Sequence, residues 1–276
     1  RKLRVWGVEA ECRYVDMEST GIYWQPIYEM LVPCFDGQIS ILVVNARHMK
    51  NVPGRKTDMR DAQWIATLLR AGLLKGSFIP DKTFRELRHL TRYRKSIVRD
   101  ITAQKNRIDK FLQSSGFRFT AFLSDAFGAS GRNIIRHLME YGNISREALD
   151  RCLKTQTRKR IDEILIALNG SLSEHQRGFL RMIFGHLEAL EQHRHTVEDA
   201  ITKEITKHEE ALSLLCSIPG IDVTAAAAII AEIGTDMSAF PDSQHICSWA
   251  GLSPGNNESA GKRKSAHINK GNPYLK

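Results

Sequence analysis

Three acidic residues stand where the sequence predicts that their side chains can meet. Asp58 and Asp61 are three residues apart in GRKTDMRDAQW, at the expected start of a helix, and Glu18 ends the alternating stretch RYVDME. Carboxylates packed this closely repel one another and resist ionisation unless a hard divalent cation lies between them. Mg²⁺ or Mn²⁺ fits such oxygen ligands, and paired Mg²⁺ ions are a common solution for phosphodiester chemistry. The three residues are therefore candidate metal ligands.

The two aspartates also have a purely structural interpretation. Thr57 or Asp58 is a good N-cap, and the helix dipole favours an acidic residue in the first turn by ~0.3–1 kcal/mol. At i and i+3, Asp58 and Asp61 share one helix face, which we expect to point toward a sheet. Asp16 lies on the same strand face as Glu18 and is a competing ligand one pleat back from the strand end. The apolar residues expected to continue the helix face are Ala62, Ile65 and Leu69.

The elements that would position these acids form an α/β unit. Residues 13–18 alternate as a strand does, residues 21–31 can form a short helix, and ISILVV at 39–44 predicts a buried parallel strand. A basic loop follows, and apolar residues recur at helical spacing from Thr57 onward. Loops that leave the carboxyl ends of adjacent parallel strands open onto one edge of a sheet, and binding sites form there. This topology favours the metal site.

Beyond Pro80 the pattern changes to long helices. Apolar residues fall on alternating three- and four-residue steps over 90–111 and 180–201, which predicts a coiled coil if three polar residues take seam positions. Those residues are Arg94, Gln104 and Arg194. Nine Lys+Arg and three Asp+Glu lie between Phe84 and Gln113, so this arm carries a net +6 of the chain's +9. The arm is either a solvated face or a nucleic-acid surface.

The C-terminal section contains two candidate binding segments. LLCSIPGIDVTAAAAIIAEIG places a Pro-Gly turn between two apolar helical stretches. This resembles a helix-hairpin-helix, whose turn presents backbone N–H groups to phosphate, although Asp222 stands where glycine is usual; the alternative is an ordinary helix-helix turn. SWAGLSPGNNESAGKRKSAHINKGNPYLK lacks periodicity, which is typical of a functional loop or of disorder.

Composition narrows the class of partner. Among 276 residues, 40 Lys+Arg outnumber 31 Asp+Glu, and the net charge of +9 favours an anionic partner. No apolar run approaches the ~18 residues of a membrane span, and the N-terminus has no signal-peptide pattern. The five cysteines include no CxxC pair, which suggests neither a disulfide framework nor a zinc site. We therefore expect nucleic acid rather than a membrane as partner, and a reducing cytoplasm as the setting.

Several long blocks together resemble one family. MESTGIYW, VVNARHMKNVPGRKTDMRDAQWIATLLRAGLL, SIPGI, AEIG, SWAGLSPGNNESAGKRKS and KGNPYLK are similar, in this order, to the DEDD-type insertion-sequence transposases. That family includes Piv-type invertases and bridge-RNA-guided recombinases. The resemblance implies α/β plus all-α architecture: a RuvC-like domain of RNase H fold at 1–80, a helical coiled-coil region at 81–210, and a helical transposase domain with a helix-hairpin-helix-like element at 211–276.

The resemblance also assigns roles to the acids. It implies that Glu18, Asp58 and Asp61 are three of the family's four D-E-D-D residues and hold Mg²⁺. The family's first aspartate belongs to a GIDV-like block on an earlier strand, and no such block precedes Glu18 in this sequence. The expectation is therefore that the RuvC-like domain lacks its first strands here and that the transposase domain extends beyond Lys276.

A serine nucleophile is implied as well. Ser259 in NESAGKRKS matches the family's short Ser-Gly block, with Ser265 as second candidate and a polar turn serine as the alternative reading. Serine attack on a phosphodiester would form a transient phosphoserine link and conserve bond energy for rejoining. Nearby basic residues would neutralise the phosphate. The expected nucleic-acid contacts are Arg55, Lys56, Lys262, Arg263, Lys264 and Lys270.

The implied function is that of a transposase or site-specific recombinase of a mobile element, acting on DNA at the nucleoid of a bacterial cytoplasm. Strand exchange needs at least two active sites, so we expect homodimers or homotetramers. Two alternatives stay open: a Holliday-junction-type nuclease that uses metal-activated water, and a non-catalytic nucleic-acid-binding remnant. A structured guide RNA is a further candidate partner, because some relatives use one and RNA and DNA phosphates attract the same residues.

Overall fold

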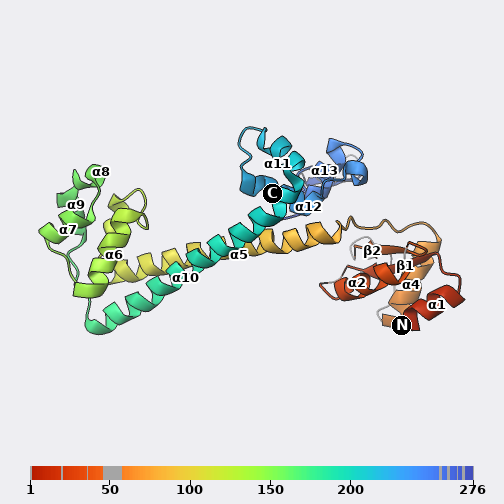
Figure 1. The fold of residues 1–276 in the computed structure, drawn as a ribbon, viewed down its shortest axis with the longest axis horizontal. Helices are drawn as coiled ribbons and strands as arrows, with labels where there is room; N and C mark the ends of the chain where they lie inside the picture. The colour runs from red at the N-terminus through yellow and green to blue at the C-terminus, as the bar shows by residue number, and fades with distance from the viewer. Residues whose placement is uncertain are drawn as a thin grey trace. The chain divides into compact units, whose positions relative to one another are not determined.

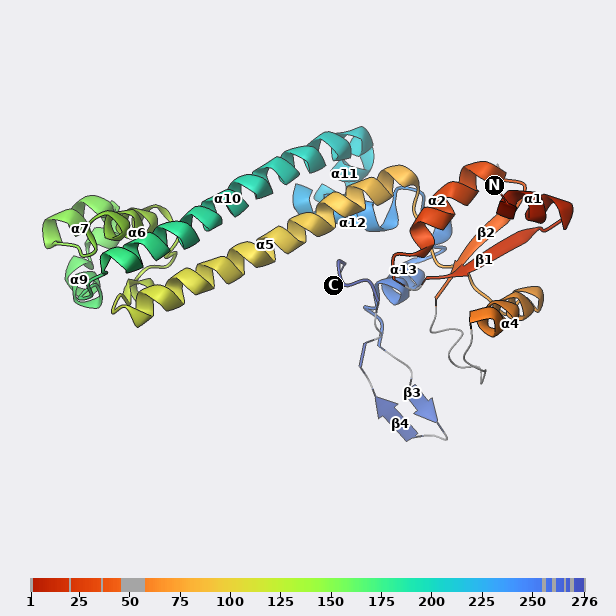
Figure 2. The same ribbon diagram turned by 90° about the horizontal axis from the view of Figure 1, so that it is seen from below.

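The computed structural model describes residues 2–19, 21–35, 37–45, 58–254, 257–259, 262–265, 267–268 and 271–275. The chain divides into two compact units, Arg1–Ile79 and Pro80–Lys276. Figures 1 and 2 show the strands and short helices of the first unit and the long helices of the second.

The first unit is a small α/β layer. Strand β1 (Tyr14–Glu18) pairs in parallel with β2 (Ser40–Val44), and α2 (Trp24–Phe35) connects them. Helix α1 (Lys2–Glu9), which the sequence did not predict, precedes β1, and α4 (Asp58–Arg70) follows β2. The expected β-α-β-α order is confirmed.

Strand alternation explains how this sheet is covered. Val15 and Met17 pack against a buried cluster that includes Leu31 and Phe35 of α2. The intervening residues of β1 face the other side, where α4 lies in Figure 2. One face of the sheet therefore builds the core with α2, and the other carries the acidic residues of β1.

Two long antiparallel helices form an arm in the second unit. Helices α5 (Lys82–Ser114) and α10 (Glu174–Ile205) lie side by side in both views. Polar seam residues of α5 bind α10: Gln104 Nε2 donates to the Ile183 carbonyl at 2.7 Å, and Arg94 Nε donates to Glu198 at 2.8 Å. The buried seam residues include Ile97, Ile101, Ile108 and Leu112 of α5 and Leu180, Leu187, Val197 and Ile201 of α10. The helical pairing is confirmed, whereas supercoiling stays a prediction.

Short helices between α5 and α10 form a cap. They are η1 (Phe119–Phe122), α6 (Ala129–Tyr141), α7 (Arg146–Cys152), α8 (Thr155–Arg158) and α9 (Ile161–Ala167). Their buried side chains continue the core of the arm, and Arg132 of α6 donates to Glu191 of α10 at 2.6 Å. The cap and the arm therefore fold as one body.

The C-terminal section packs on the arm and contains a β-hairpin near its end. Its elements are η2 (Thr206–His208), α11 (Glu209–Cys216), α12 (Val223–Ile233), η3 (Met237–Ala239), α13 (Ser243–Ala250), β3 (Asn257–Ser259) and β4 (Lys262–Ser265). Helix α12 contacts both α11 and α5. The sequence did not predict strands β3 and β4, because a short charged hairpin shows no apolar alternation. No helix in the described ranges combines the length and apolarity needed to cross a bilayer.

Candidate active site

The carboxyl ends of β1 and β2 form one edge of the small sheet. Glu18 is the last residue of β1 and pairs with Val44, the last residue of β2. The amide of Ser19 donates to the Val44 carbonyl at 2.9 Å, so pairing continues to the edge. Glu18 is half-buried there. Its backbone thus lies at the position where a parallel β-α-β unit usually builds a site.

Asp16 is an acid at this face whose surroundings the structure describes. Its Oδ2 atom is buried and has no hydrogen-bond partner among the described residues. Burial raises the pKa of Asp16 above its usual range, and a backbone hydrogen bond partly opposes the shift. Because alternate residues of a strand point the same way, Asp16 shares its face with Glu18. A buried oxygen without a donor fits a cation site, so Asp16 becomes an additional candidate ligand.

Helix α4 begins at Asp58, which places Asp58 and Asp61 in its first turn. The side chains of these two aspartates lie outside the described residues. Further along α4, Leu68 is buried and Trp64 is half-buried, whereas Ala62, which we expected on the sheet-facing side, is exposed. The expectation that Asp58 and Asp61 point toward the sheet stays a prediction.

The described residues contain no group of three His, Cys, Asp or Glu side chains that could hold a metal ion. The metal site of Glu18, Asp58 and Asp61 therefore stays a prediction. Its support is the chemistry of the donor set and the unpartnered oxygen of Asp16.

Ser259 lies at the tip of the C-terminal hairpin. It is the last residue of β3 and pairs with Lys262, the first residue of β4, while Glu258 pairs with Arg263. The second serine candidate, Ser265, ends β4. The backbone pairing therefore brings Ser259 opposite the start of a run of three basic residues, Lys262, Arg263 and Lys264. The side chains of the two serines and of these basic residues, and the whole of Arg55, Lys56 and Lys270, lie outside the described residues.

Close backbone contacts hold the two ends of this hairpin together. Pro254, which precedes β3, and Ile268, which follows β4, form an antiparallel bridge. Past that bridge, Gly271 runs against the end of α13, where an added Cβ would stand 2.2 Å from the carbonyl carbon of Ala250 and the nitrogen of Gly251. Only glycine permits so close an approach. The chain that leaves the hairpin is thus fixed directly beside the chain that enters it.

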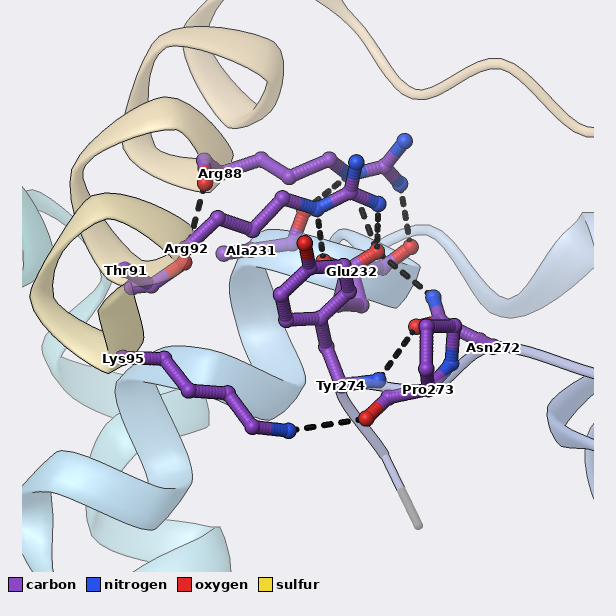
Figure 3. A network of polar contacts seen from close by, with 9 residues as sticks. All are labelled: Arg88, Thr91, Arg92, Lys95, Ala231, Glu232, Asn272, Pro273 and Tyr274. Atoms are coloured by element: carbon purple, nitrogen blue, oxygen red, sulfur yellow. Dashed lines mark hydrogen bonds and ion pairs between the residues drawn. The ribbon is translucent and has the colours of Figure 1, made fainter. Parts of the chain in front are cut away.

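A buried carboxylate anchors the segment that follows the hairpin (Figure 3). The side chain of Glu232 in α12 is 1% exposed, and its two oxygens accept hydrogen bonds from Arg92 at 2.7 and 2.9 Å. Arg88 places Nε 3.1 Å from Oε2 and donates through Nη2 to the Glu232 carbonyl at 2.6 Å. Asn272 donates to Oε2 at 2.6 Å. Burial lowers the pKa of Arg88, and the charge of Glu232 opposes that shift.

Tyr274 completes the anchor on the surface of α5 (Figure 3). Its ring centre lies 4.3 Å from the guanidinium carbon of Arg92 and 5.0 Å from Lys95 Nζ. Lys95 also donates to the Pro273 carbonyl at 2.8 Å, and the Tyr274 amide donates to Asn272 Oδ1 at 2.9 Å. The sequence pattern did not indicate this network. The available signal was one acid, Glu232, in the otherwise apolar stretch VTAAAAIIAEI.

Comparison with known proteins relates two segments of the chain to transposases. Residues 2–116 match a family model described as Transposase, of the DEDD type from IS110 elements, and residues 212–276 match the Transposase IS116/IS110/IS902 family. The "Insertion element IS110 uncharacterized 43.6 kDa protein" of Streptomyces coelicolor is 28% identical over 239 residues. That alignment covers 79% of this chain and 58% of the relative, so the chain spans less than two-thirds of the relative's length.

Proposed function

Because the chain belongs to the family of IS110-type DEDD transposases, we propose that it cleaves and rejoins DNA as the transposase or site-specific recombinase of an insertion sequence. One observation carries the proposal: both transposase matches occur in one chain, and each contains one half of the expected chemistry. The first match contains the acidic edge with Glu18, Asp58 and Asp61, and the second contains the hairpin with Ser259.

We assign metal binding to the acidic edge. Glu18, Asp58 and Asp61 are the proposed ligands, with Asp16 as an additional candidate because its buried Oδ2 has no donor among the described residues. A bound Mg²⁺ or Mn²⁺ would activate the attacking oxygen and stabilise the leaving oxygen. The carboxylates would hold the cation in place. The pairing of β1 with β2 fixes the backbone of Asp16 and Glu18.

We assign nucleophilic attack to Ser259, with Ser265 as second candidate. A bond forms between the serine Oγ and the scissile phosphorus as the bond from phosphorus to one deoxyribose oxygen breaks. The serine proton passes to a basic group, and the leaving oxygen takes up a proton. The reverse attack by a deoxyribose hydroxyl rejoins a strand without an outside energy source. Lys262, Arg263 and Lys264 would neutralise the charge on the phosphate.

DNA contact beyond the site would use the remaining basic and backbone groups. The turn between α11 and α12 contains Gly220 at φ +90° and resembles the phosphate-binding turn of a helix-hairpin-helix. The net +6 of the stretch from Phe84 to Gln113 favours a polyanion along α5. DNA and a structured guide RNA both satisfy this chemistry. We propose DNA as the substrate and keep a guide RNA as a candidate second partner.

Strand exchange also requires more than one subunit. We propose a homodimer or homotetramer, in which acids from one chain act with Ser259 of the same chain or of a partner chain. The paired helices α5 and α10 are the proposed assembly surface, since long helical arms commonly associate through exposed faces.

Metal-dependent cleavage tests the acidic half of this proposal. The protein, with its flanking sequence, would be incubated with DNA that carries the ends of the insertion sequence. We expect cleavage with Mg²⁺, none with EDTA, and a loss of at least about 100-fold in rate for Glu18→Gln, because a lost ligand weakens or misplaces the cation. The exposed Glu9 of α1 supplies the control, Glu9→Gln, which should cleave normally. Cleavage that persists in EDTA and in Glu18→Gln would overturn the proposal.

A further inference from the structure

We propose that Glu232 is a positioning residue for strand cleavage. Through Arg88, Arg92 and Asn272 it fixes the base of the Ser259 hairpin to helices α5 and α12. The base is the bridge between Pro254 and Ile268. The positioning role rests on the proposed role of the hairpin serine. The relevant atoms lie within one compact unit, Pro80–Lys276. Glu232 touches neither Ser259 nor the acidic edge in any described contact, so its effect on chemistry would pass through the hairpin alone.

The composition of the network indicates positioning rather than simple stabilisation. A carboxylate that is 1% exposed loses most of its hydration, and two arginines must be held in place to compensate it. Apolar residues of similar size would hold two helices together at least as well. Arginine hydrogen bonds differ from apolar contacts in that they fix the orientation of the two helices. Arg92 contacts both carboxylate oxygens of Glu232, and Arg88 contacts the side chain and the backbone carbonyl of Glu232. The network therefore sets one register of α12 on α5.

Asn272 connects the Glu232 network to the chain that leaves the hairpin. Its amide nitrogen donates to Glu232, and its amide oxygen accepts from the backbone of Tyr274, so one side chain binds both the core acid and its own turn. Asn272 follows directly after Gly271, which is pressed against Ala250 and Gly251. Asn272 comes four positions after Ile268, which forms the bridge with Pro254. The residue that binds Glu232 and the bridge at the base of the hairpin are therefore close along the chain.

Tyr274 and Lys95 hold the tail, which is the described segment 271–275 after the hairpin. The Tyr274 ring stacks on the cation of Arg92, while Lys95 faces the same ring and binds the Pro273 carbonyl. Arg92 thus contacts both the buried Glu232 and the half-buried Tyr274. Loss of either contact would free the tail while leaving the buried helices of the arm in place.

Position matters because serine attack needs near-attack geometry. A misplacement of about 1 Å lowers the rate by about 100-fold even when the substrate is bound normally. A loosened base would move Ser259 by such amounts and would leave the proposed DNA surface along α5 in place. The expected signature is a fall in the single-turnover cleavage rate with an unchanged Kd for DNA.

Two tail variants and one matched control test the inference without removing the buried charge. Asn272→Ala deletes the bond to Glu232, and Tyr274→Leu deletes the stacking on Arg92. Tyr274→Phe keeps the ring and is the control. Hydrogen–deuterium exchange of the peptide over 252–268 should accelerate about tenfold in Asn272→Ala, the factor expected for one hydrogen bond to a charged group. It should also accelerate, by a smaller factor, in Tyr274→Leu, which loses a cation–π contact, and stay unchanged in Tyr274→Phe. Exchange over 97–112 in α5 should not change in any variant.

The exchange result and the activity result separate the two claims. Faster exchange over 252–268 with a cleavage rate reduced about 10- to 100-fold and an unchanged Kd supports the positioning role. Unchanged exchange in both tail variants overturns it, whatever the activity. Faster exchange with undiminished cleavage also overturns it, because the hairpin would then be anchored without consequence. A wild-type protein that cleaves no DNA while the tail variants exchange faster contradicts the proposed function and the positioning role but leaves the anchor itself intact.

Discussion

Asp16 and Glu232 both hold carboxylate oxygens out of water, and they differ in how those oxygens are satisfied. Glu232 receives hydrogen bonds from Arg92 and Asn272 and an ion pair from Arg88, so its charge is compensated inside the protein. Asp16 has a buried oxygen with no donor among the described residues. An uncompensated buried oxygen destabilises a fold unless something outside the chain binds it. Glu232 therefore acts as an anchor within the protein, whereas Asp16 is a candidate metal ligand.

Asp16→Asn tests the ligand role through stability. Removing the unpaired charge should raise the midpoint of thermal unfolding without metal by about 2–4 °C. Millimolar Mg²⁺ should stabilise the wild-type protein, because a cation bound only by the folded state favours folding, and should stabilise Asp16→Asn less. Thermal denaturation with and without Mg²⁺ measures both effects. The exposed Asp100 of α5 gives the control Asp100→Asn, and equal Mg²⁺ responses in wild type and Asp16→Asn would argue against the ligand role.

At the scale of elements, α12 connects the candidate nucleic-acid turn with the anchor of the hairpin. Its first residue follows Asp222, whose Oδ1 accepts a hydrogen bond from the Ala225 amide at 2.7 Å. The helix ends with Glu232 and Ile233, at the buried network on α5. This explains Asp222 in a turn where glycine is usual: the carboxylate caps the helix, as aspartate does well at an N-cap.

Replacement of that cap should weaken α12 measurably. We expect Asp222→Ala to lower the free energy of unfolding by about 1 kcal/mol, since an N-cap side chain satisfies an amide that otherwise lacks a partner. Asp222→Asn retains a capping oxygen and should lose only a few tenths of a kcal/mol by the same rule. Denaturant unfolding followed by circular dichroism measures both values. Equal losses in the two variants would show that the cap contributes no hydrogen-bond stabilisation.

The sequence predicted secondary structure best where the spacing of apolar residues reflects which side of an element is buried. The alternation of residues 13–18, the apolar run 39–44 and the spacing after Thr57 all correspond to elements of the structure, because one face of each is packed. Burial on α4 still differed by residue, with Ala62 exposed and Trp64 half-buried. A helix stripe is wide, so spacing alone does not say which neighbours lie at its centre.

The hairpin and its anchor could not be predicted in this way. Strands β3 and β4 are short and polar, so they carry no hydrophobic pattern. The anchor joins residues more than 130 positions apart, Arg92 with Glu232, and single-sequence periodicity does not report pairings of that range. Two quoted blocks of the sequence, AEIG and KGNPYLK, nevertheless meet in the bond between Glu232 and Asn272. The resemblance therefore marked both halves of a contact that spacing did not reveal.

At the scale of the whole molecule, the proposed reaction requires groups from both compact units. The acids belong to Arg1–Ile79, and Ser259 belongs to Pro80–Lys276. A metal-binding edge alone could support hydrolysis by water, and a serine hairpin alone has no metal ion to activate the attacking oxygen or stabilise the leaving oxygen. Their presence in one chain favours cleavage through a protein–DNA link, which keeps the strand end available for rejoining.

The most direct test is whether DNA becomes covalently linked to Ser259. The protein with its flanking sequence would react with Mg²⁺ and DNA carrying the ends of the insertion sequence, followed by denaturation and mass spectrometry of the DNA-linked peptide. We expect a link at Ser259 that is absent from Ser259→Ala and retained in Ser265→Ala. A link that survives Ser259→Ala would contradict the assignment of the nucleophile. Cleavage without any link would contradict the serine mechanism itself and indicate hydrolysis by metal-activated water.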